Sequence, residues 1–167
     1  MKSYDNKIID VMNCPGCAYA NHEFSLSCGM AYEDEDVTLS QDWELPIPGF
    51  FVISPNNHAS KISEIDPEVL RKINEIVQET IKILENNNVC DGFNIISEEK
   101  NNRHYHIWIM PRHKWMTENY QNIMTNIGPI FEYAKTNLRN EETYESILNI
   151  TNLVREELSK KFNNTRR

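Results

Sequence analysis

The sequence of 167 residues has no long apolar run. Two of its most continuous apolar stretches, Phe50–Ile53 and Ile107–Met110, are much shorter than the roughly 18 residues that a membrane helix needs. The first ten residues, MKSYDNKIID, lack the apolar core of a secretory signal. We therefore expect a cytoplasmic protein that has no membrane partner.

The sequence also lacks a surplus of positive charge, because 17 Lys and Arg stand against 25 Asp and Glu. A formal net charge of −8 argues against a duplex nucleic acid partner, which is held mainly by neutralising its phosphates. An internal repeat, a low-complexity tract and a flexible linker are missing as well. The length then suits one domain with an extension.

Cysteine is scarce, with four residues in all, so a disulfide framework is not expected in a reducing compartment. Cys14 and Cys17 form a CxxC pair around Pro15-Gly16, a spacing that allows two thiolates to reach one tetrahedral zinc. The same spacing serves thioredoxin-like redox pairs, although it favours zinc here. Cys28 and Cys90 are expected to be buried as small apolar residues, with Cys28 as a reserve ligand.

Apolar spacing predicts an α+β fold, an antiparallel sheet crossed by one long helix. Asp66-Pro67-Glu68 is a helix start, and apolar residues at helical spacing follow it as far as Leu84. The expected strands are two within Phe24–Trp43 joined at the acidic turn Glu33–Asp36, then Gly49–Ser54, residues 89–98 and residues 104–110.

Beyond Pro111-Arg112 the pattern becomes helical. One helical segment is expected within Glu118–Leu138, interrupted near Gly128-Pro129, and another from about Glu141 to Phe162. We therefore divide the chain into a domain at residues 1–115 and a helical extension at residues 116–167.

The segment HYHIWIMPR at residues 104–112 carries the most chemical information. In a strand, side chains alternate, so His104, His106, Trp108 and Met110 share one face. Two histidines on an open face are consistent with one metal ligand and one nucleophile. The simpler alternative is a hydrogen-bonded, partly exposed pair.

HYHIWIMPR resembles the signature of the histidine-triad (HIT) superfamily. Further pieces occur in the family's order: the CxxC pair, the stretch from Asp42 to His58 with its Pro-Gly-apolar strand, and the Gly-Phe-Asn-Ile strand at Gly92–Ile95. The resemblance covers residues 10 to 115 and implies the HIT fold and a homodimer.

The resemblance implies a structural zinc ion held by Cys14, Cys17, His58 and His104. It makes His106 the nucleophile that attacks the α-phosphorus of a small nucleotide substrate. A backbone carbonyl is expected to orient the ring of His106. For His58, the alternative is an ordinary loop residue.

The resemblance also implies nucleotide-binding residues. Asp42 matches a ribose-binding carboxylate, and Trp43 stands where the family has a nucleobase contact, although core packing would explain a tryptophan too. Trp108 could stack on a base, and Arg112, Arg103 or Lys100 could supply charge to phosphate oxygens.

Two departures from the family pattern affect the activity. Trp108 replaces the third histidine and cannot relay a proton to a leaving group, and the Gly-Gln-Ser/Thr stretch before the motif is missing. The uridylyltransferase-like branch also lacks the third histidine. Our first hypothesis is a nucleotidyl hydrolase or transferase acting on phosphoramidates, dinucleoside polyphosphates or nucleotide sugars. The alternatives are a nucleotide-binding module without turnover and a CxxC redox protein.

Overall fold

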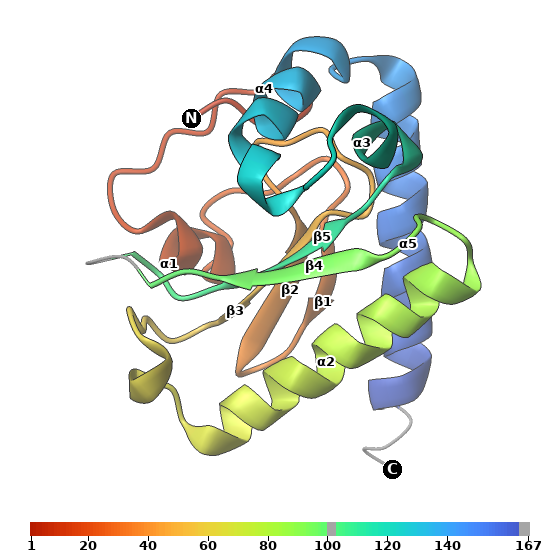
Figure 1. Ribbon diagram of the computed structural model, residues 1–167. Coiled ribbons are helices and arrows are strands. Elements are labelled where there is room, and N and C mark those ends of the chain that lie inside the picture. Colours follow the sequence, from red (N-terminus) through yellow and green to blue (C-terminus); the bar gives the residue numbers. More distant parts are fainter. Residues whose placement is uncertain (100–102, 164–167) are drawn as a thin grey trace.

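Five strands form one antiparallel sheet in the computed structural model, which describes residues 1–99 and 103–163 (Figure 1). Their order is β1-β2-β3-β5-β4, so the last two strands are exchanged relative to the sequence. The bounds are β1 (Met30–Glu33), β2 (Val37–Gln41), β3 (Phe51–Pro55), β4 (Phe93–Ser97) and β5 (Ile107–Pro111). The α+β prediction is confirmed.

Five α-helices and two short 3-10 helices accompany the sheet in the described part of the chain. They are α1 (Pro15–Ala20), η1 (Ile62–Glu64), α2 (Pro67–Asn86), α3 (Lys114–Asn119), η2 (Met124–Asn126), α4 (Ile127–Asn137) and α5 (Glu141–Asn163). Among these helices, none combines the length and the apolar character needed to span a membrane.

Helix α2 begins as its sequence predicts. The carboxylate of Asp66 accepts a hydrogen bond from the backbone N–H of Glu68 at 2.8 Å, and Pro67 occupies the first helical position. The apolar stripe is buried, with Ile73, Ile76 and Leu84 fully inaccessible. It packs with α5 over one face of the sheet, against Phe51, Ile53, Ile107 and Ile109.

The opposite face of the sheet is covered by the first part of the C-terminal extension. Phe50 of the β2–β3 connection and Met110 of β5 pack against Met116 of α3 and against Ile130 and Ala134 of α4. The extension therefore crosses from one face of the sheet to the other, since α5 lies with α2. The sheet has a hydrophobic core on each side.

The expected interruption of the extension near Gly128-Pro129 is wrong. Both residues lie in the first turn of α4, where proline is tolerated because its missing N–H has no helical partner there. The helical pattern breaks earlier, at residues 120–123 between α3 and η2.

The acidic turn between β1 and β2 is tied to α2. Asp34 accepts hydrogen bonds from the backbone N–H groups of Asp36 and Val37 at 2.9 and 3.1 Å. Lys72 of α2 pairs with Asp34 and Asp36. The first expected strand is shorter than its pattern, because residues 24–29 form a loop before β1.

Candidate functional site

Two thiols and two imidazoles converge beside the sheet. The ligand atoms of Cys14, Cys17, His58 and His104 all lie within 4.8 Å of one another, and we refer to these residues as the Cys₂His₂ cluster. The cluster joins three segments that are at least 41 residues apart in the sequence. They are α1 with its N-cap, the loop after β3 and the segment before β5.

Helix α1 brings the two thiols together. Cys14 is its N-cap and Pro15 its first residue, so Cys17 lies one helical turn after Cys14. Gly16 permits the approach of His104, because a Cβ at this position would lie 2.6 Å from the Cγ and Nδ1 atoms of that ring. The CxxC pair thus spans the start of a short helix.

The distances fit a tetrahedral metal. The Sγ atoms of Cys14 and Cys17 each lie 3.5 Å from Nδ1 of His104, and Sγ of Cys17 lies 3.4 Å from Nδ1 of His58. Around a tetrahedral zinc ion, bonds of about 2.3 Å to sulfur and 2.0 Å to nitrogen place the sulfur and nitrogen atoms about 3.5 Å apart. The Cys₂His₂ cluster is thus suited to zinc in size and in donor chemistry.

The far side of the His104 ring is held in the way a metal ligand requires. Its Nε2 donates to the carbonyl oxygen of Pro55 at 2.7 Å, an assignment that leaves the lone pair on Nδ1 facing the thiols. Burial lowers the pKa of His104, so the neutral ring is favoured.

His106 is oriented by the residue two positions before it. Its Nδ1 lies 2.9 Å from the backbone oxygen of His104, which can only accept a hydrogen bond. The proton therefore sits on Nδ1, and the lone pair is on Nε2. This confirms the prediction that a backbone carbonyl orients His106.

Trp108, at the third position of the motif, is part of an aromatic cluster. Its ring centroid lies 5.6 Å from that of His106, 5.8 Å from that of Phe50 and 5.7 Å from that of Phe131 on α4. The indole is half-buried beneath the extension. The space next to His106 is therefore bounded by an apolar wall.

Comparison with known proteins agrees with this geometry. The family model described as the HIT domain matches residues 25–115, which is more than half of the chain. The chain belongs to the HIT family. No curated protein sequence matches it.

Solved structures show the same fold. A hypothetical histidine triad nucleotide-binding protein from Sulfolobus tokodaii has a TM-score of 0.62 at 19% identity, over 89% of this chain and 96% of that one. A zinc-bound histidine triad family protein from Mycobacterium smegmatis has 0.59 at 18%, over 87% and 98%. A HIT family protein from Bacillus anthracis has 0.53 at 22%, over 72% and 99%.

In this HIT protein, Asp42 follows β2 and its carboxylate is engaged locally. Oδ1 accepts hydrogen bonds from the backbone N–H groups of Glu44 and Leu45 at 3.0 and 2.9 Å. Burial nevertheless raises the pKa of Asp42 to about 6, since these two hydrogen bonds offset only part of the loss of hydration.

Trp43 faces an aromatic cluster of the HIT protein's N-terminal region. Its ring lies 5.4 Å from Tyr19 and 5.3 Å from Phe24, and its indole N–H donates to Ser40 at 3.3 Å. The side chain is partly buried, so the contact with a nucleobase stays a prediction.

Arg112 lies at the opposite end of β5 from His106. Six residues of extended chain span about 20 Å, which is too far for Arg112 to contact a phosphoryl group on His106. Arg103 is exposed close to the motif histidines, and Lys100 lies outside the described residues. Arg103 therefore stays a predicted phosphate contact.

The remaining histidines and cysteines lie outside the Cys₂His₂ cluster. His113 donates through Nε2 to the carbonyl of Pro48 at 2.8 Å, and His22 forms an exposed ion pair with Glu33 at 3.3 Å. Cys28 is buried and Cys90 half-buried, as expected for packing residues.

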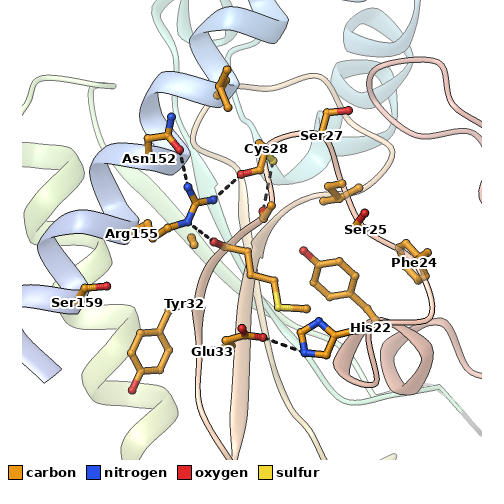
Figure 2. A pocket seen from close by; sticks show the side chains of 16 residues that line it. His22, Phe24, Ser25, Ser27, Cys28, Tyr32, Glu33, Asn152, Arg155 and Ser159 are labelled. Atoms are coloured by element: carbon orange, nitrogen blue, oxygen red, sulfur yellow. Dashed lines mark hydrogen bonds and ion pairs between the residues drawn. The ribbon is translucent and has the colours of Figure 1, made fainter. Parts of the chain in front are cut away.

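A cleft of about 730 Å³ lies between β1, the loop before it and α5 (Figure 2). Figure 2 shows the Arg155 guanidinium bonded to Asn152 and to backbone oxygens of the β1 region, and His22 paired with Glu33. Of the residues predicted for the site, only Cys28, the reserve zinc ligand, lines this cleft.

Proposed function

We propose that this HIT protein is a zinc-stabilised enzyme that hydrolyses or transfers nucleotidyl groups through a covalent intermediate on His106. The orientation of His106 is the observation that supports the proposal most directly. With Nδ1 donating to the His104 carbonyl, Nε2 carries the lone pair needed for attack.

In the proposed reaction, Nε2 of His106 attacks the α-phosphorus, and the bond from phosphorus to the leaving group breaks. Water, or another acceptor, then attacks the phosphorus of the nucleotidyl-histidine and releases the imidazole. The leaving group needs a proton that Trp108 cannot relay. A substrate with a weakly basic leaving group, such as a phosphoanhydride, depends least on this proton.

Zinc, when bound, would act as a structural cross-link of the Cys₂His₂ cluster. His104 connects that cluster to the reaction, because its ring belongs to the cluster and its backbone oxygen orients His106. Asp42 would accept hydrogen bonds from ribose hydroxyls through the carboxylate oxygen that its backbone contacts leave available. The substrate class is nucleotide phosphoramidates, dinucleoside polyphosphates or nucleotide sugars.

The decisive experiment compares wild type with His106→Ala on a panel of these nucleotides. We expect His106→Ala to lose turnover, and a labelled α-phosphate to be trapped on wild type alone. His22→Ala is the matched control, because His22 is an exposed histidine that pairs with Glu33. Equal activity of His106→Ala and wild type would refute the mechanism.

A second candidate is a nucleotide-binding module without turnover. The packing of Trp108 between Phe50 and Phe131 favours it, because the third motif position is then held by an indole that cannot act as a general acid. Loss of a general acid typically lowers the rate by about 10² to 10⁴. This candidate predicts nucleotide binding by calorimetry and no product across the same panel.

A CxxC redox function is less well supported, since a redox pair does not need two imidazoles beside the thiols. One zinc per chain in purified protein would count against it.

A further inference from the structure

A second polar cleft lies near the end of β5 that is far from His106. Its volume is about 300 Å³, at the low end for ligand pockets. It is bounded by β4, by Arg112 and by the segment at residues 117–124 of the extension. Trp108 and Met110 lie between His106 and this cleft along β5, so the two places are separate.

Arg112 lacks a partner in this cleft. Its Nε is inaccessible to solvent and makes no hydrogen bond, and Arg112 occurs in none of the ion pairs between described residues. The guanidinium lies against Gly92, where a Cβ would collide with it. Backbone pairing of Arg112 with Gly92 at 2.7 Å fixes this position.

A second unpartnered donor occurs in the same cleft. Nδ2 of Asn94 is also inaccessible and has no hydrogen-bond partner. Buried donors without an acceptor are rare in folded proteins, because each loses its hydrogen bonds to water and gains none in return. No carboxylate lines the cleft, whose other polar side chains belong to Thr117, Tyr120, Gln121 and Asn122.

We propose that Arg112 and Asn94 bind a small oxyanion, the phosphate or carboxylate group of a small molecule. A guanidinium and an amide NH₂ both donate, so the ligand must supply acceptors and negative charge. The role of Arg112 then differs from the one the sequence suggests, since its anion is not the phosphoryl group on His106.

The test is an NMR titration of the full chain, following the Arg112 Nε–H and Asn94 side-chain signals. One arm adds inorganic phosphate, the other adds acetate, and both are matched to chloride at equal ionic strength. We expect saturable shifts of both signals with at least one anion. The arm that saturates at the lower concentration identifies the group recognised.

Asn94→Asp is the informative variant, because a carboxylate of the same size would pair with Arg112 and exclude the anion. It should fold, unfold at a higher temperature in chloride buffer and lose the anion response. Arg112→Gln should also lose the response, while Arg71→Gln, at an exposed arginine of α2, should keep it. Absence of saturable shifts in wild type, or their survival in Asn94→Asp, would overturn the proposal.

Discussion

His104 holds the candidate site together through three of its own atoms. Nδ1 faces the two thiols, Nε2 donates to Pro55, and the backbone oxygen accepts from His106. A change in the cluster should therefore reach His106, the proposed nucleophile, through His104 alone. Loss of the metal should therefore disturb the orientation of His106 even though His106 is not itself a metal ligand.

The first residue-scale prediction concerns Cys14→Ser. Loss of one thiolate should remove the zinc and lower the free energy of unfolding by several kcal/mol, because metal binding contributes folding free energy. Metal content by mass spectrometry and thermal unfolding measure both effects. Cys90→Ser is the control, since Cys90 is half-buried outside the cluster, and it should retain the metal. Full metal content in Cys14→Ser would disprove the ligand assignment.

The second residue-scale prediction uses the pKa of Asp42, which burial raises to about 6 from its usual 3.8. Between these values the folded state binds more protons than the unfolded state, so stability due to Asp42 falls as pH rises. Asp42→Asn should keep the backbone hydrogen bonds and raise stability at pH 7 by about 1–2 kcal/mol.

The gain from Asp42→Asn should disappear below about pH 4, where the carboxyl is protonated in both states. Denaturant unfolding of wild type and variant over a pH series measures this. A gain that stays constant with pH would show that the carboxylate is not destabilised. Nucleotide affinity should fall in the same variant if Asp42 binds ribose.

Among the elements, α5 is attached to the sheet edge by one arginine. Arg155 donates through Nε to the Met30 carbonyl at 2.7 Å and through Nη2 to the Cys28 carbonyl at 2.5 Å (Figure 2). These backbone oxygens belong to the region of edge strand β1, which would otherwise present unpaired groups. Arg155 thus closes one edge of the sheet.

Arg155→Met should lower the free energy of unfolding by about 2–4 kcal/mol, because it leaves two carbonyl oxygens without their charged donor. Lys160→Met on the same helix is the matched control, since Lys160 only makes an exposed pair with Glu157, and it should change stability by less than about 0.5 kcal/mol. Chemical denaturation measures both. Equal effects of the two variants would contradict this role of Arg155.

Local signals explain which elements were predictable. Helix α2 was accessible to sequence reasoning because Asp66, Pro67 and a continuous apolar stripe act within the helix itself. Helix α1 was not, since six residues form a helix only when tertiary contacts stabilise them. The site residues near His106 were found through motif spacing, whereas the cover over Trp108 depends on where α4 packs.

The unpartnered donors of Arg112 and Asn94 could not be predicted either. Each residue type is ordinary in a strand region, and only the fold shows that neither finds an acceptor. The sequence places Asn94 in the Gly-Phe-Asn-Ile strand and Arg112 at the end of HYHIWIMPR. It does not show how far either side chain lies from His106. Without that distance, Arg112 was predicted to contact the phosphate of the nucleotide that His106 attacks.

At the scale of the whole molecule, the two edges of the sheet differ. The β1 edge is covered by α5 and Arg155, while β4 forms the other edge and carries Ile95, which is 49% exposed. An edge strand with an exposed apolar side chain is suited to pairing with a second copy. We propose that the homodimer implied by the family resemblance forms along β4.

Ile95→Lys should then convert the protein to a monomer, because a charge on the strand would be buried in the joined sheet. Sedimentation velocity over a concentration series measures the oligomeric state. Ile62→Lys is the matched control, since Ile62 is 44% exposed on η1 and lies outside the sheet, and it should leave the dimer intact. A wild type that stays monomeric throughout the series, or a dimer that survives Ile95→Lys, would exclude the β4 edge as the contact.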